Sequence, residues 1–468
     1  MSRPFPRLRV PVLDFQPVRD ELEIPVAFPP EVEAAAAAAA KAPRLPSVDA
    51  TDVELITVDP PGSMDLDQAL HVATRPGGGF RVHYAIADVA AFVIAGDPID
   101  VEARKRGETL YSPDLRTPLH PTAIGEGAAS LLPDQDRPAL LWQIDLDSSG
   151  RQVAVDLRRA MVRSRARLDY AGLQQMLDAG TAPAATTALP EIGRLRAAIA
   201  AERGAIELGL PDQEVEQVDG RWTVVRRQPL PVESWNADIS LLTGMAAAGL
   251  MLDAKIGLLR TLPPAEQFTV DQLRHAARAL EVPWPHGTTP ADLIRSLDPA
   301  QPAQAALLEE AAHLLRGAGY TPFDGEVPGE TGHAGVGAPY AHVTAPIRRL
   351  CDRFTNEVCV AVAAGAEVPA WARDALPLLP ALMAASGNRA HRLDREAVDL
   401  TEAWLLADRV GQTFAAAVVE SDAKGVTVML DDPPVRARCT GRPELGTRIE
   451  VRLTAADTAS RSVTFAPV

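Results

Sequence analysis

The stretch Asp59–Leu70, DPPGSMDLDQAL, places three carboxylates within nine residues. These are Asp59, Asp65 and Asp67. The proline and glycine residues that follow Asp59 force the backbone to turn, because proline cannot continue a regular ladder and glycine favours turn geometry. The stretch is therefore predicted to be a short acidic turn and not part of a helix or strand.

Strands are predicted on both sides of this turn. VELITV (53–58) has the β-branched content of a buried strand, while ALHVA (69–73) and FRVHYAIADVA (80–90) form a hairpin around PGGG. A rigid scaffold of this kind can hold several anionic oxygens together, and hard divalent cations offset their repulsion. The alternative is a solvated turn, since aspartate often caps backbone NH groups in turns.

Composition indicates a soluble protein of more than one domain. The net charge of −16 over 468 residues disfavours a protein that coats nucleic acid non-specifically, because that role needs many basic residues. No run of about 18 uncharged apolar residues occurs, and the N-terminus is too polar for a secretory signal, so a cytoplasmic location without membrane contact is expected. Three cysteines without a CxxC pair predict neither disulfides nor a thiolate zinc site.

The chain divides into three parts by its patterns. Residues 1–50 are expected to be an arm with one helix over 30–42. Residues 51–408 begin with strands up to about residue 168 and continue with helices, including 234–257. Residues 409–468 alternate as short strands between Gly, Pro and Asp turns, which predicts a small all-β barrel. The fold class is thus α/β (α+β), a mixed β core wrapped by helices, followed by a barrel of the OB type.

Two further patterns involve arginine. The segment 151–168 alternates as a strand and puts four arginines on one side, which indicates either a phosphate-facing wall or a solvated strand face. They are Arg159, Arg163, Arg165 and Arg167. The segment from Ile347 has helical spacing, with Arg348 and Asp352 four residues apart, so Asp352 is expected to orient Arg348.

Several motifs recur in the order typical of one family. The acidic turn of residues 59–70, called the acid loop below, resembles the RNB family of exoribonucleases, which includes bacterial ribonuclease II and ribonuclease R. The resemblance extends to RGETLYSPD (106–114), SLLPDQDRPAL (130–140) and GHAGVGAPYAHVTAPIRRLCDRF (332–354). The resemblance implies processive 3′-to-5′ hydrolysis of single-stranded RNA to nucleoside 5′-monophosphates. It also implies an RNB nuclease domain, Mg²⁺ (or Mn²⁺) as two ions, and no small-molecule cofactor. A monomer is expected.

The resemblance also implies roles for particular residues. The catalytic set is Asp59, Asp65, Asp67 and Arg348, with the three aspartates as metal ligands. The RNA-binding set is Tyr111, Tyr170, Asp238, Arg349 and His342. His342 has a structural, hydrogen-bonded role as its alternative. Independently, two cations held by carboxylates can activate water and stabilise the leaving oxygen, and arginine fits phosphate oxygens with its planar fork.

Two departures from the family pattern qualify these expectations. Gln68 stands where the family has its fourth acid, so one metal would bind more weakly or through water, and an RNA-binding protein without turnover is the alternative function. A phosphohydrolase of small nucleotides is a third reading, for which Tyr111 and the terminal barrel would have no use. The 50 residues before the nuclease domain cannot supply the family's cold-shock domains, which predicts more open access for RNA.

Overall fold

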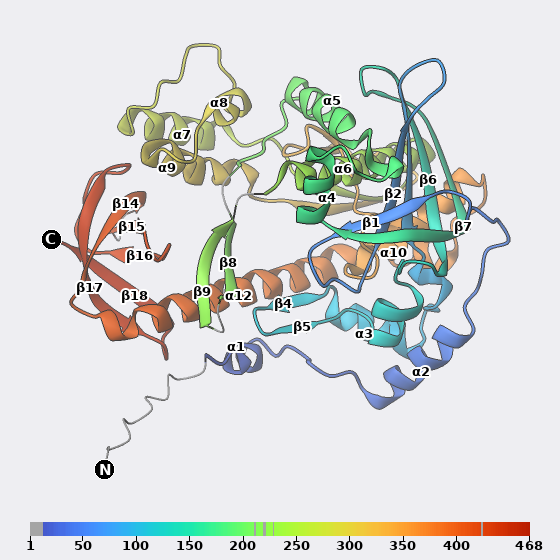
Figure 1. The fold of residues 1–468 in the computed structure, drawn as a ribbon, viewed down its shortest axis with the longest axis horizontal. Helices are drawn as coiled ribbons and strands as arrows, with labels where there is room; N and C mark the ends of the chain where they lie inside the picture. The colour runs from blue at the N-terminus through green and yellow to red at the C-terminus, as the bar shows by residue number, and fades with distance from the viewer. Residues whose placement is uncertain (1–12, 210–211, 219–220, 228, 423–424) are drawn as a thin grey trace.

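The computed structural model describes residues 13–209, 212–218, 221–227, 229–422 and 425–468 (Figure 1). Its centre is a closed barrel with the strand order β1-β2-β3-β6-β7. The strands are β1 (Leu55–Asp59), β2 (Gln68–Thr74), β3 (Phe80–Ala87), β6 (Asp136–Leu146) and β7 (Gln152–Asp169). The predicted mixed β core is confirmed, and its strands close on themselves.

The barrel closes because β1 pairs on both sides. It is antiparallel to β2, with Ile56 opposite Leu70, and parallel to β7, with Asp59 opposite Asp169. Trp142 and Tyr84 are fully buried in the core of this barrel. The acid loop is the β1–β2 connection, so it lies at one end of the barrel and its two ends are fixed by paired strands.

Helices surround the barrel and carry the rest of the main core. The α-helices are α1 (Gln16–Glu21), α2 (Pro30–Lys41), α3 (Pro98–Arg106), α4 (Tyr170–Asp178), α5 (Leu189–Glu202), α6 (Pro231–Ala254), α7 (Gln267–Ala279), α8 (Pro290–Ser296), α9 (Pro302–Ala311), α10 (Leu350–Ala363), α11 (Ala370–Arg373) and α12 (Leu379–Leu406). Within the described residues, α6 alone is long and apolar enough to cross a membrane by length and composition. Ile239, Leu242 and Met251 of α6 are buried in the main core.

The C-terminal strands form a second closed barrel with the order β14-β15-β16-β18-β17. Its strands are β14 (Thr413–Asp422), β15 (Gly425–Leu430), β16 (Arg436–Cys439), β17 (Arg448–Asp457) and β18 (Ser462–Pro467). The predicted all-β barrel is confirmed. The long helix α12 runs from the part of the molecule that holds the first barrel to this second barrel, so it connects the two (Figure 1).

The remaining strands form short two-stranded sheets. These are β4 (Leu110–Ser112) with β5 (Leu115–Thr117), β8 (Asp212–Val218) with β9 (Arg221–Arg227), β10 (Ile256–Thr261) with β11 (Gly319–Asp324), and β12 (Gly332–His333) with β13 (Ala338–Pro339). Arg19 of α1 is buried and binds both carboxylate oxygens of Asp114, in the β4–β5 turn, at 2.6 and 3.0 Å. The N-terminal arm therefore holds this hairpin in place.

The four arginines that were predicted to share one side of the 151–168 segment lie on β7 and contact protein acceptors. Arg159 donates to Asp88 at 2.8 Å and also pairs with Glu357. Arg163 pairs with Asp136 at 2.6 Å, while Arg165 and Arg167 donate to backbone carbonyls. These partners disfavour a phosphate-facing wall. Arg159 and Arg163 are ion-paired within the protein, so a merely solvated strand face does not describe them either. The acids that neutralise Arg159 are remote in sequence, so strand alternation alone could not reveal them.

Candidate active site

Asp67 is the anchor of the acid loop. Its side chain is fully buried, directly before β2. One carboxylate oxygen accepts a hydrogen bond from the backbone NH of Ile347, and the other accepts from Nε of Arg348, both at 2.7 Å. The contact joins residues 281 apart in sequence. Folding therefore brings the acid loop and the PIRR segment (residues 346–349) into one site.

The backbone of the PIRR segment is fixed independently of its side chains. The carbonyl of Arg348 accepts from the NH of Thr109 at 2.8 Å, and the NH of Leu350 donates to Gly107 at 2.9 Å. Gly107 has φ of +76°, and a Cβ there would lie 2.5 Å from the Cβ of Ser386. Both the left-handed backbone and the close approach require glycine, so this residue helps to set the position of Arg348.

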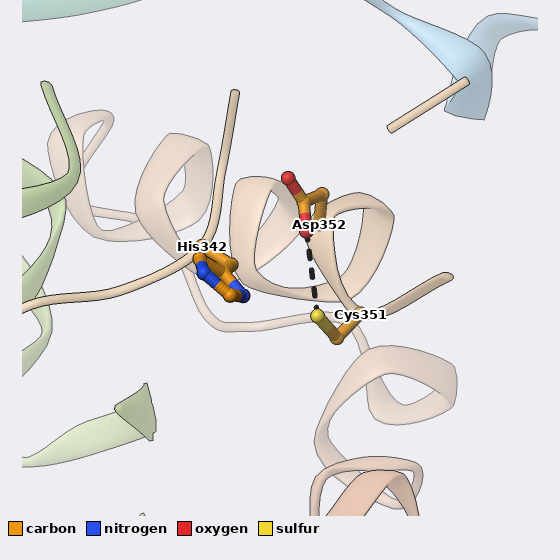
Figure 2. Close-up of side chains that lie close together, drawn as sticks. All are labelled: His342, Cys351 and Asp352. Atoms are coloured by element: carbon orange, nitrogen blue, oxygen red, sulfur yellow. Dashed lines mark hydrogen bonds between the residues drawn. The ribbon is translucent and has the colours of Figure 1, made fainter. Parts of the chain in front are cut away.

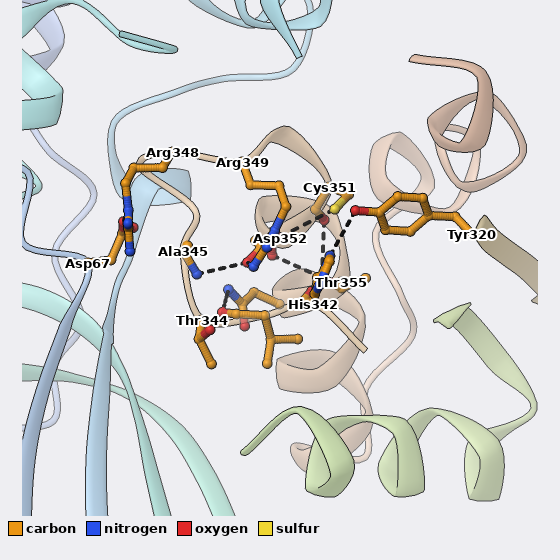
Figure 3. A network of polar contacts seen from close by, with 12 residues as sticks. Asp67, Tyr320, His342, Thr344, Ala345, Arg348, Arg349, Cys351, Asp352 and Thr355 are labelled. Atoms are coloured by element: carbon orange, nitrogen blue, oxygen red, sulfur yellow. Dashed lines mark hydrogen bonds and ion pairs between the residues drawn. The ribbon is translucent and has the colours of Figure 1, made fainter. Parts of the chain in front are cut away.

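The expected pairing of Arg348 with Asp352 is wrong. The helix α10 begins at Leu350, so both arginines precede it and the helical spacing does not apply. Arg349 places Nε and Nη2 on the Asp352 carboxylate at 2.6 and 2.8 Å. Asp352 also accepts from the NH of Ala345 at 2.8 Å. Figure 3 shows that the adjacent residues Arg348 and Arg349 point to different partners, Asp67 and Asp352. Arg349 is thus committed to the protein in this structure.

His342 belongs to the same buried network. Its Nδ1 lies 2.8 Å from the Tyr320 hydroxyl, and burial together with Arg349 keeps the pKa of the imidazole well below its usual value. Figure 2 shows His342 beside Cys351 and Asp352, and the possible ligand atoms of the three lie within 4.8 Å of one another. The sequence did not indicate these partners for His342, because their proximity depends on the loop that precedes α10.

This trio fits a structural network better than a metal centre. Asp352 has both oxygens on Arg349, so a cation would compete with a bidentate guanidinium. Burial holds the pKa of the Cys351 thiol well above its ordinary value, whereas a metal ligand must be the thiolate. The geometry supports the structural role that was the alternative for His342.

The acid loop itself fits a divalent cation. Asp59, at the end of β1, has a buried oxygen, Oδ2, with no hydrogen-bond partner. Burial raises the pKa of this carboxyl to about 6, with Arg348 opposing the shift and Asp65 adding to it. Buried polar atoms are normally satisfied, and carboxylate oxygens are the ligands that Mg²⁺ and Mn²⁺ prefer. The unpartnered oxygen therefore suits a hard cation held by Asp59 and its neighbours.

Asp59→Asn is expected to stabilise the metal-free protein at neutral pH. A carboxyl whose pKa is higher in the folded state binds its proton more tightly when folded. Wild type therefore loses stability as pH rises from about 4 to about 6 and keeps that deficit above it. The expected gain for Asp59→Asn at pH 7.5 is about 1 to 3 kcal/mol. Urea unfolding in EDTA at pH 4 and pH 7.5 measures it.

Two results would contradict that reading of Asp59. One is an equal stability difference at both pH values, and the other is a less stable variant at pH 7.5. Addition of Mg²⁺ provides the control, since it should stabilise wild type more than Asp59→Asn.

Gln68 is bound to the protein through both ends of its amide. Nε2 donates to the carbonyl of Thr344 at 2.6 Å, and Oε1 accepts from the Tyr84 hydroxyl at 2.7 Å. The same hydroxyl lies 2.7 Å from Oγ of Ser240 on α6. Gln68 thus connects β2 to the segment that carries Arg348, a role that needs an amide donor and that a carboxylate could not fill.

Gln68→Glu is expected to destabilise the protein by about 1 to 3 kcal/mol at pH 8, because an ionised oxygen would face the carbonyl of Thr344. The penalty should shrink at pH 5 as the new carboxyl takes up a proton. Urea unfolding at the two pH values tests this. Gln267→Glu makes the same change at an exposed site on α7 and should cost a few tenths of a kcal/mol. Equal losses for the two variants would refute the proposed link.

Both predicted tyrosines lie beside the acids. Tyr111 is on β4 with 52% of its surface exposed, and burial raises the pKa of its hydroxyl while Arg348 opposes the rise. Tyr170 begins α4, directly after the residue that pairs with Asp59. Burial and the Asp59 carboxylate raise the pKa of Tyr170, and Asn236 opposes this through a hydrogen bond. Two aromatic side chains therefore flank the acid loop.

Asp238 is not brought to the acid loop. The charges that act on its carboxyl belong to Arg196, Glu207 and Arg203, and burial raises its pKa to about 7. Residues two positions apart in an α-helix differ by about 200° around the helix axis. Asp238 therefore faces away from Asn236, which contacts Tyr170. The structure therefore places Asn236, and not Asp238, beside Tyr170.

Arg116 is a member of the site that sequence reasoning missed. It lies on β5, and its Nη1 is 2.5 Å from Oδ1 of Asp65. Its Nη2 pairs with Glu126. The sequence signal was weak, because an arginine that closely follows the turn residue Asp114 gives no indication of which distant carboxylate it will contact.

Comparison with known proteins identifies both barrels. Residues 47–363 match the RNB domain, and residues 412–468 match the RNase II-type exonuclease C-terminal S1 domain. Ribonuclease R of Escherichia coli K12 is 26% identical over 505 residues, covering 95% of this chain and 60% of the relative. Exosome complex exonuclease dis3 of Schizosaccharomyces pombe is 28% identical over 321 residues, covering 65% of this chain and 33% of the relative.

Solved structures share the fold. The apo form of Mycoplasma genitalium RNase R matches with a TM-score of 0.83 at 20% identity, covering 97% of this chain and 77% of that one. Yeast Ssd1, described as a pseudonuclease, matches with a TM-score of 0.69 at 18% identity, covering 88% and 53%. This chain spans about 60% of the length of the ribonuclease R relative. The same fold thus occurs in a nuclease and in a protein without that activity.

Proposed function

This chain belongs to the RNB family, and we propose that it is a metal-dependent exoribonuclease that hydrolyses single-stranded RNA from the 3′ end. The products would be nucleoside 5′-monophosphates, released processively. The cation would be Mg²⁺ or Mn²⁺, held by Asp59, Asp65 and Asp67. We also propose a cytoplasmic monomer with three parts, an arm (1–50), the nuclease domain (51–408) and the terminal barrel (409–468).

One observation carries the proposal, the contact between buried Asp67 and Arg348. It places an arginine of which 38% is exposed beside a carboxylate cluster with an unpartnered oxygen. Carboxylates that can hold a cation, next to a cation that can hold a phosphate, are what phosphodiester hydrolysis needs. A purely structural ion pair would not require the unpartnered oxygen of Asp59.

The protein side chains would divide the work as follows. A bound divalent cation would supply the activated water and charge stabilisation. Asp67 holds Arg348 in one orientation, and the exposed part of the guanidinium is available to the phosphoryl oxygens. Tyr111 and Tyr170 offer faces for base stacking, which is tolerant of sequence and contributes about 1 to 3 kcal/mol per base. An enzyme that accepts each nucleotide in turn needs such tolerance.

A time course on labelled RNA tests the proposal. With 5′-labelled single-stranded RNA, we expect shortening to one small limit product in Mg²⁺ or Mn²⁺ and none in EDTA. With 3′-labelled RNA, the first labelled product should be a mononucleotide. Circular RNA of the same sequence should survive, because it has no 3′ end. Cleavage of the circle, or intact linear RNA in every metal, would refute the proposal.

The second candidate is an RNA-binding protein with little or no turnover. The contacts of Gln68 favour it, because both ends of the amide are occupied by Thr344 and Tyr84, which limits what this residue can offer a cation. Retained RNA affinity with intact RNA in Mg²⁺ and Mn²⁺ would select it. Turnover in either metal would exclude it.

A further inference from the structure

Arg116 is placed against the acid loop by a short hairpin. It pairs directly opposite Tyr111 across β4 and β5, and side chains at directly opposed positions lie on the same face of a hairpin. Arg19 fixes the turn of that hairpin through Asp114. The position of Arg116 is therefore built into the fold and does not depend on a flexible surface loop.

The guanidinium of Arg116 bridges two carboxylates. Nη1 lies 2.5 Å from Asp65, and Nη2 pairs with Glu126 in the π-helical segment Ala123–Ala128. The Asp65 side chain is 11% exposed and that of Arg116 is 25% exposed. Charges that are removed from water to this extent interact more strongly than on an open surface. A cation that binds Asp65 must compete with Arg116.

The other two aspartates of the acid loop differ from Asp65 in their hydrogen-bond partners. Asp67 has one oxygen on Ile347 and the other on Arg348, whereas Asp59 has the unpartnered Oδ2. Two of the three loop aspartates, Asp65 and Asp67, are thus each already ion-paired with one arginine. Glu126 shares Arg116, so the three aspartates and Glu126, taken with Arg348 and Arg116, have a net charge of −2. One divalent cation would neutralise this charge, whereas two would exceed it.

We propose that Arg116 is a positioning residue that serves as the resident counter-charge of Asp65, so that this site takes a single divalent cation, held chiefly by Asp59. The inference deepens the proposed function and rests on the acid loop being its metal site. It differs from the expectation of two ions, which came from the family resemblance and did not include Arg116.

Isothermal titration with Mn²⁺ on the full chain, at pH 7.5 without RNA, tests the inference. Wild type should bind one Mn²⁺ in the acid loop, and Asp59→Asn should abolish that binding. Arg116→Gln should bind a second Mn²⁺ or bind the first about tenfold more tightly, since one opposing charge is removed. Arg116→Lys, which keeps the charge, should resemble wild type. Glu126→Gln removes the second carboxylate that Arg116 pairs with, so the full charge of Arg116 would act on Asp65 and Mn²⁺ binding should weaken.

The outcomes separate this inference from the proposed function. Two Mn²⁺ ions in wild type would overturn the inference, as would unchanged ion number and affinity in folded Arg116→Gln. A loss of RNA affinity in EDTA for Arg116→Gln, with Mn²⁺ binding unchanged, would make Arg116 an RNA ligand and also overturn it. The proposed function fails instead if wild type binds Mn²⁺ but leaves RNA intact. Arg163→Gln, which breaks a surface pair with Asp136, is the matched control.

Discussion

Asp67→Asn is expected to reduce RNA hydrolysis by about a hundredfold to a thousandfold. The substitution removes a buried negative charge that both faces the proposed metal and orients Arg348. The asparagine oxygen can still accept from Ile347, but its NH₂ group would face Nε of Arg348, donor to donor. Initial rates on 5′-labelled single-stranded RNA in saturating Mg²⁺ measure the effect.

Stability must be separated from chemistry in that experiment, because the mismatched donor is expected to cost about 1 to 3 kcal/mol. Asp59→Asn makes the separation, since Oδ2 of Asp59 has no protein partner to lose. It should lose activity to a similar extent while remaining folded. Asp136→Asn, at an exposed ion pair, should keep wild-type rates. A fully active Asp59→Asn would remove the acid loop from the mechanism.

The sequence predicted the architecture well because its signals are local. Strand alternation, turn residues and the pattern of short strands between turns in residues 409–468 each depend only on neighbours in the chain. Both β regions predicted from these patterns are present, as closed barrels. The helix predicted over 30–42 is observed as Pro30–Lys41. Placement of Tyr111 and Tyr170 near the acids followed from the family resemblance, and the structure positions both residues there.

Pairings across the fold could not be predicted in the same way. Asp352 was assigned to Arg348 because both were placed on one helix, but α10 starts two residues after Arg348. The partner of Arg348 is instead Asp67, 281 residues away. The position of Asp238 was equally hard to predict, since the sequence could not show which face of α6 meets Tyr170. Arg116 was missed because its partner Asp65 is joined to it only by tertiary structure.

Arg348→Lys is expected to lower the turnover number by about a hundredfold, with a smaller effect on the affinity for long RNA. Lysine keeps the positive charge but not the planar fork, so it cannot hold Asp67 and a phosphate oxygen with fixed geometry at once. Single-turnover rates and RNA binding in EDTA give the two quantities. Arg349→Lys tests whether the loss is specific to Arg348. Because Arg349 is bound to Asp352, this substitution should mainly change the free energy of unfolding.

A double-mutant cycle then decides whether Asp67 and Arg348 act as one unit. If Asp67 works by orienting Arg348, the double variant should be only about as impaired as the less active of the two single variants, because each substitution already breaks the same contact. Additive losses would mean that Asp67 serves the metal alone and that Arg348 finds its orientation elsewhere. Since the NH of Thr109 fixes the backbone of Arg348, its Cα position should survive either substitution, and the cycle reports on the guanidinium itself.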